Sequence, residues 1–326
     1  MKRLMIAALA GGAFASGALA ADLPAKKGPI APPPVSADGF DFAFGAKIMS
    51  DYVSRGITQS DWKPSATAYF EGRYNIGDTQ FYAAVQPWTV KLPTNPAAEV
   101  DLSLGVRQTW GKFTVDVGGI YYWYPDNKRQ FWTSGVPGTP GGFTFLNPVG
   151  FNAATCAGPG FCATTAKDPS FLELYIKPSY NVTDLFNIGA NFYWSPNWNN
   201  YNFQSGYISA TAKYTFGESG FSVSGELGRM LLGSLKAGTI FNAGPAKFKY
   251  PDYTTWNVGV SYAWKNLTAD LRYHGSDMNK TKCYINTSDP SGNAVGFGYT
   301  GRSNWCGHRI MASIALDFVY SKDFKK

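Results

Sequence analysis

The chain of 326 residues is poor in charge and rich in aromatic rings, since charged residues and aromatic residues each make up 16% of it. A water-soluble domain usually carries about 25% charged residues, so this composition argues against an ordinary soluble domain. The formal net charge is +7, but the basic residues are scattered and form no run, so nucleic-acid binding is not predicted.

Residues 1–20 predict export from the cytoplasm. A positively charged start leads into an apolar stretch at 4–14, and Ala18-Leu19-Ala20 fits the small-x-small pattern that signal peptidase accepts. The apolar core is too short to cross a membrane as a helix, and no later stretch approaches the roughly 18 apolar residues required. We therefore expect a signal peptide that is cleaved before Ala21.

Residues 21–39 predict a proline-rich linker, with Pro29 followed by three prolines at 32–34. Proline fixes φ and donates no hydrogen bond, so this segment is expected to be extended and unpaired. A flexible periplasmic tail is the favoured interpretation, and docking to a periplasmic partner or to the cell wall is the alternative.

From residue 40 onward, apolar and polar residues alternate, which is typical of a strand with one apolar and one polar face. Phe40, Phe42 and Phe44, for example, alternate with Asp41 and other small or polar residues. Each such segment spans about ten residues, the length that a tilted strand needs to cross a bilayer. Further segments lie at 100–106, 113–123, 172–176, 186–192, 208–214, 256–262, 267–273 and 312–318.

The connections between these segments alternate between short and long. Tight turns are expected at 75–79, 111–112, 181–184, 217–220 and 265–266, and long connections at 56–64, 89–97, 125–169, 195–204, 231–252 and 276–307. Periplasmic turns and extracellular loops of an outer-membrane barrel alternate in this way. The sequence therefore predicts an all-β fold, a transmembrane antiparallel β-barrel of about 12 strands over 40–326. A soluble β-sandwich also alternates, but it would not sort its connections so cleanly.

In such a barrel the apolar residues face lipid and the polar alternates face the lumen, which twelve strands leave narrow or partly occluded. Opposed charges across a lumen select solutes by charge, whereas paired charges form a salt-bridge web that stiffens it. Both roles are open. The candidates for lining and selectivity are Lys47, Asp51, Arg55, Arg73, Asp101, Arg107, Asp116, Glu173, Lys177 and Arg272, and Glu71, Lys213, Glu226 and Asp270 share their inward face.

Arg55 is the strongest single candidate, because it is expected at the junction of the first strand and its loop, directly before Gly56. A structural role, in which Asp51 and Arg55 brace the first loop, is favoured over contact with solute.

The four cysteines predict disulfides, because an even number in an exported chain is typical of an oxidising compartment. The favoured pairs are Cys156–Cys162 and Cys283–Cys306, each within one expected extracellular loop, although bridges between loops are also open.

Residues 51–59, Asp-Tyr-Val-Ser-Arg-Gly-Ile-Thr-Gln, resemble the first-strand signature of the TorF-type porin family of proteobacterial outer-membrane proteins. Segments 99–102, 120–125 and 173–175 are similar to later strands of that family, in the same order. The resemblance implies a single barrel acting as a porin whose substrate is generally undefined. The chain departs from the family in its long 125–169 loop and in its C-terminal tail, where either Phe318 or Phe324 would be the terminal aromatic residue for barrel assembly.

The sequence favours a bacterial outer-membrane porin for small polar or charged solutes. Neither an enzyme nor a metal site is predicted. The expected partners are lipid, lipopolysaccharide and the barrel-assembly machinery. The alternatives are a non-conducting surface barrel whose loops bind or adhere, and an outer-membrane hydrolase built on His274 and Ser276. No cofactor is expected: residues 296–301 match G-x-G-x-x-G but follow no parallel strand and open no helix. The solute and the oligomeric state are left open.

Overall fold

The computed structural model describes residues 38–127, 131–133, 144–146, 162–164, 168–236, 247–289, 293–295 and 300–324. The expected signal peptide, nearly all of the linker and Cys156 lie outside these residues. No helix within them is long and apolar enough to span a membrane.

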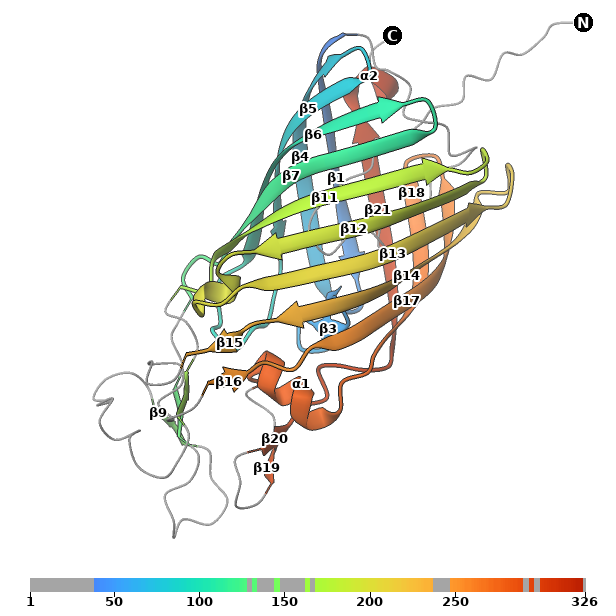
Figure 1. Cartoon of the computed structure of the whole chain (residues 1–326). Coiled ribbons are helices and arrows are strands. Elements are labelled where there is room, and N and C mark those ends of the chain that lie inside the picture. Colours follow the sequence, from blue (N-terminus) through green and yellow to red (C-terminus); the bar gives the residue numbers. More distant parts are fainter. Residues whose placement is uncertain are drawn as a thin grey trace, which may run out of the picture.

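Twelve strands of the described chain close into one antiparallel barrel (Figure 1). Each strand pairs with its neighbours along the chain, and β1 closes the ring against β21, with Phe44 opposite Phe318. The barrel fold predicted from the sequence is therefore confirmed. The strands are β1 (Gly39–Met49), β4 (Ser65–Ile76), β5 (Thr79–Trp88), β6 (Glu99–Trp110), β7 (Phe113–Trp123), β11 (Phe171–Asn181), β12 (Phe186–Ser195), β13 (Ser205–Thr215), β14 (Phe221–Leu232), β17 (Tyr253–Trp264), β18 (Leu267–Ser276) and β21 (Arg309–Val319).

The alternation of the sequence becomes the two faces of the wall. In β6, Leu102 and Leu104 point outward and are exposed, whereas Asp101 and Ser103 point into the barrel and are buried. Closure pairs the backbone groups of every wall strand, which a sheet in hydrocarbon requires. The outer surface is thus apolar and the inner surface polar.

The short turns lie at the end of the barrel that carries the C terminus, and the long connections lie at the opposite end, called the loop end below (Figure 1). Gly77 and Gly111 take positive φ in two of the turns, as tight hairpins require. Helix α2 (Tyr320–Asp323) follows β21 at the turn end. It brings Phe324 back onto Phe44 and Phe318, so both candidate terminal aromatics join one outer cluster.

The long connections carry small elements of their own. They are β2 (Val53–Ser54), β3 (Ile57–Thr58), β8 (Phe131–Thr133), β9 (Thr144–Leu146), β10 (Cys162–Thr164), the 3-10 helix η2 (Trp198–Asn200), β15 (Ser234–Leu235), β16 (Phe248–Lys249), α1 (Lys280–Thr287), β19 (Asn293–Val295) and β20 (Thr300–Arg302). Several of them lie at the loop end in Figure 1.

Residues 51–59 are placed differently from the prediction. The first wall strand ends at Met49, and the segment that was expected to finish it forms the separate hairpin β2–β3. Arg55 and Gly56 take positive φ at its tip and turn the chain back on itself, so Asp51 and Arg55 belong to a loop. This hairpin is the centre of the candidate site.

Candidate functional site

The β2–β3 hairpin reaches across the barrel interior. Its turn residues Arg55 and Gly56 have φ of 47° and 77°, the left-handed pair that a tight two-residue hairpin turn needs. The tip lies against the wall at β17 and β18, since a Cβ added to Gly56 would stand 2.5 Å from Oγ1 of Thr255 on β17 and 3.2 Å from Cβ of Ser276 on β18.

Arg55 ties the hairpin tip to a third part of the wall. Its Nη1 and Nη2 donate to the two carboxylate oxygens of Glu173 on β11, at 2.8 and 2.7 Å. The guanidinium also lies over the rings of Tyr193 and Tyr207, at 4.9 and 4.6 Å from their centroids. Fork-to-fork pairing of this kind is strong and geometrically specific, so it fixes the tip within the lumen.

The base of the hairpin is held by Asp51. This carboxylate accepts hydrogen bonds from Thr58 at 2.5 Å and Ser60 at 2.8 Å, and it pairs with Arg309 of β21 at 3.0 Å. The Thr58 N–H donates to the carbonyl of Trp305, at 2.9 Å. The first loop is therefore braced against the last one, as the sequence favoured for Asp51 and Arg55.

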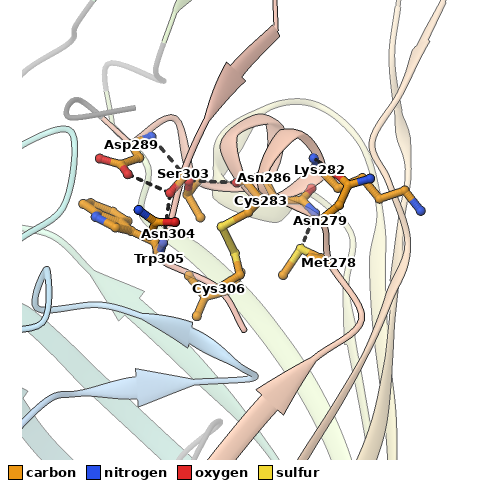
Figure 2. Close-up of a disulfide and its surroundings, with 12 residues drawn as sticks. Met278, Asn279, Lys282, Cys283, Asn286, Asp289, Ser303, Asn304, Trp305 and Cys306 are labelled. Carbon is orange, nitrogen blue, oxygen red and sulfur yellow. Dashed lines mark hydrogen bonds between the residues drawn. A yellow bond between two sulfur atoms is a disulfide. The ribbon is translucent and has the colours of Figure 1, made fainter. Parts of the chain in front are cut away.

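A disulfide holds in place the segment against which the hairpin is braced. Cys283 of α1 and Cys306 are bonded, which confirms one of the two predicted pairs. Figure 2 shows the bond linking α1 to the segment before β21, with Trp305 beside Cys306. Ser303 donates to Asp289 at 2.7 Å in the same cluster, and Cys306 forms a backbone bridge with Ile57.

A cavity of about 160 Å³, called the vestibule below, lies at the loop end beside the hairpin tip. Aromatic rings and polar or charged groups make up most of its lining, together with a few aliphatic side chains. The aromatic lining is Tyr52, Tyr122, Tyr124, Phe171, Trp198, Tyr201, Tyr250, Tyr253 and Trp305, and the polar lining includes Arg55, Thr58, Gln59, Glu99, Glu173, Asn199, Asn286 and Thr287.

Two buried carboxylates of β6 stand at this level. Glu99 accepts hydrogen bonds from Tyr52 at 2.7 Å and Tyr124 at 2.8 Å, and Asp101 accepts one from Nε1 of Trp88 at 3.0 Å. Burial, and then the charge of Glu99, raise the pKa of the Tyr52 hydroxyl well above its ordinary value, so this phenol stays protonated and donates. Within the described part of the chain neither carboxylate has an ion-pair partner.

Deeper in the barrel, one wall carries a packed ionic web. Arg107 pairs with Glu71 at 2.8 Å and Asp116 at 3.2 Å, Arg73 pairs with Glu71 at 2.5 Å, and Lys177 reaches Asp116 at 3.5 Å. All five side chains are buried. This web joins β4, β6, β7 and β11 and stiffens that side of the lumen.

The opposite wall is more open. Lys47, Lys213, Glu226 and Asp270 face inward but are only half-buried. Arg272, between them, is fully buried and donates to Asp270, Asn257 and Ser224 at 2.8 to 3.2 Å. The half-buried groups of this wall are therefore partly accessible to water.

All ten predicted lining residues face the interior, but they form separate groups. Arg55 and Glu173 meet at the hairpin tip, Asp51 lies at its base, and Asp101 lies beside the vestibule, while the others line the deeper lumen. Sequence reasoning missed Glu99 and the tyrosines that bind it. Glu99 shares the inward face of β6 with Asp101, and this alternation was the signal that could have found it.

The residues of the hydrolase alternative, His274 and Ser276, both lie buried on the inner face of β18. In the described structure the Ser276 hydroxyl has no hydrogen-bond partner, so it is not paired with a base. A serine nucleophile needs such a base within reach.

Comparison with known proteins adds a family match. Residues 35–135 match the model of a bacterial protein family of unknown function, Gcw_chp, and this segment is less than half of the chain. No curated protein matches the sequence.

Similar solved structures are membrane barrels of low identity. A mutant of TodX, a monoaromatic hydrocarbon channel, has a TM-score of 0.44 at 10% identity, over 87% of this chain and 91% of that one. OmpT, an outer-membrane protein of Vibrio cholerae, has a TM-score of 0.39 at 11% identity, over 86% and 97%. The KdgM porin has a TM-score of 0.39 at 9% identity, over 85% and 99%. Likeness of this degree carries no argument about the function of this chain.

Proposed function

We propose that the protein is an outer-membrane channel for small polar solutes, constricted by the β2–β3 hairpin. The observation that carries this proposal is the position of Arg55. It crosses the interior to Glu173 and lines the vestibule, inside a lumen whose wall also carries the half-buried Lys47, Lys213 and Asp270. A polar lumen inside an apolar outer wall is the arrangement of a porin.

The sequence adds two supports. The expected signal peptide would deliver the chain to the periplasm, from which outer-membrane barrels insert. The resemblance of residues 51–59 to TorF-type porins falls on the hairpin that forms the constriction.

A non-conducting surface barrel is the second candidate. Its support is the apolar cluster at the loop end, where Phe203, Tyr250 and Trp305 pack with wall residues such as Tyr207 and Met230. If this cluster seals the mouth, the loops would serve binding and the lumen would carry no current.

Single-channel recording of residues 21–326, refolded and inserted in a planar bilayer, tests the proposal. We expect steady open steps, and Arg55→Ala should raise the unit conductance by roughly twofold or more, because it removes the charged group that narrows the lumen. Arg229→Ala is the matched control, since Arg229 is exposed on the outer face. A silent barrel that is folded, as judged by heat-modifiable migration on a gel, would refute the channel and favour the surface barrel.

A further inference from the structure

The loop-end half of the lumen carries more carboxyl groups than basic groups. Glu99, Asp101 and Glu173 are each at most 3% exposed, and Arg55 is the cation that pairs with one of them. Glu99 and Asp101 receive hydrogen bonds from neutral phenol and indole groups instead. A buried carboxylate without a counter-charge either takes up a proton or is stabilised by a cation, so a cation that enters this site gains the attraction of the ionised groups.

The rings around Glu99 add a second attraction for a cation. Tyr52, Tyr122, Tyr124 and Tyr253 line the same cavity as this carboxylate. The face of an aromatic ring attracts an ammonium group, most strongly where water is excluded. Arg55 already exploits this chemistry, since its guanidinium lies over two tyrosine rings beside the cavity.

We propose that the vestibule is a binding site for a small organic ammonium ion. Its charged group is held by Glu99, and its carbon groups pack on the surrounding tyrosine and tryptophan rings. The cavity of about 160 Å³ has the volume of roughly five water molecules, which suits a compact ammonium ion. The inference rests on the proposed function only in treating the vestibule as the outer mouth of a channel.

A neutral sugar is the main competing ligand, because sugars also stack on aromatic rings. It would supply hydroxyl groups but no charge for Glu99, the carboxylate that lines the cavity, and both oxygens of Glu99 already accept a hydrogen bond from a tyrosine. Because this carboxylate has no ion-pair partner in the described structure, an ammonium ion is favoured over a neutral sugar as the ligand.

Isothermal titration calorimetry tests the site on residues 21–326 refolded in detergent. The probes are choline, its neutral isostere 3,3-dimethylbutanol, and glucose. Choline should bind saturably and at least about tenfold more tightly than either neutral probe, a difference of about 1.4 kcal/mol. Equal binding of choline and its isostere, tighter binding of glucose, or no heat from choline would overturn the proposal.

Glu99→Gln should weaken choline binding by about tenfold or more. The amide oxygen of the glutamine keeps an acceptor for one of the two phenols, Tyr52 or Tyr124, and its NH2 group can donate to the oxygen of the other. Glu218→Gln, the same change on an exposed residue of a turn at the other end, should have no effect. Unchanged affinity in Glu99→Gln would also overturn the site. If that variant does not fold, the comparison of choline with its isostere on the unaltered chain still decides.

Calorimetry is independent of conduction, so the two proposals fail separately. A barrel that binds choline but passes no current would remove the channel and keep the site. A barrel that conducts but does not prefer choline would remove the site alone.

Discussion

Arg55 occupies a backbone region that side-chain-bearing residues avoid. Its φ of 47° costs an L-residue about 1–2 kcal/mol, and Asn or Gly would fill this turn position more easily. The two charge-assisted hydrogen bonds to Glu173 and the two tyrosine faces offset that cost. Strain of this kind persists only where the surrounding structure holds it, and this supports the role that we propose for Arg55 in the lumen.

Gly56 gives a direct test of how tightly the hairpin tip fits. Gly56→Ala and Gly77→Ala both place a methyl group at positive φ, at a shared cost of about 1 kcal/mol. The added Cβ meets nothing at Gly77, but at Gly56 it would stand 2.5 Å from Thr255. We expect Gly56→Ala to lower the free energy of unfolding by about 1–3 kcal/mol more than Gly77→Ala, because of this overlap.

Urea unfolding of the two variants in lipid vesicles measures the difference. Because the tip could move instead of the barrel losing stability, the unit conductance is recorded for both variants. Equal unfolding midpoints combined with equal conductance would mean that the tip does not press on the wall at Thr255.

At the scale of elements, the hairpin depends on the segment after α1. The Cys283–Cys306 bond closes a loop of 23-residue separation, and Trp305 and Cys306 contact β3 through backbone bonds. In the chain-entropy model, closing a loop of this length lowers the entropy of the unfolded chain and so stabilises the folded state by about 3 kcal/mol. The bond therefore stabilises the segment that holds the β2–β3 hairpin, without joining any two wall strands.

Replacing both cysteines, Cys283→Ser with Cys306→Ser, should leave the barrel folded and loosen only this support. We expect faster cleavage by added protease between 277 and 308 and noisier open-channel current, since the hairpin loses part of its brace. Dithiothreitol should reproduce both effects in the unaltered chain and add little in the double variant. Proteolysis that is no faster in the variant would show that the hydrogen bonds of the cluster suffice.

The wall elements were predictable and the hairpin was not, for a physical reason. In a strand that separates lipid from a lumen, apolar and polar side chains must alternate from one residue to the next. The sequence of residues 99–110 therefore shows by itself which side chains face lipid and which face the lumen. The placement of residues 51–59 depends instead on partners far along the chain: Arg55 and Glu173 are 118 residues apart, and Asp51 and Arg309 are 258 apart. No local pattern encodes such pairs, so the inward-pointing charges were predicted but their grouping was not.

At the scale of the whole molecule, net charge is a poor guide to the lumen. The chain carries a formal net charge of +7, yet at the vestibule Glu99, Asp101 and Glu173 outnumber Arg55. Charges on the turns and outer loops are screened within about 10 Å at ordinary salt, whereas buried groups of the lumen act at close range. We therefore expect the lumen to favour cations, in line with the local surplus of carboxylates and against the net charge of the chain.

Whether the apolar outer surface of the barrel faces lipid can be tested by substitution. Leu104, in the middle of β6, and Ile310, the second residue of β21, both point outward and are both 69% exposed. Arginine on the lipid face of a barrel costs about 2–4 kcal/mol at the bilayer midplane and about 0–1 kcal/mol near the interface. Leu104→Arg should thus reduce the free energy of unfolding in lipid vesicles far more than Ile310→Arg. In water the two substitutions would cost alike, so equal effects would mean that this apolar band does not face hydrocarbon.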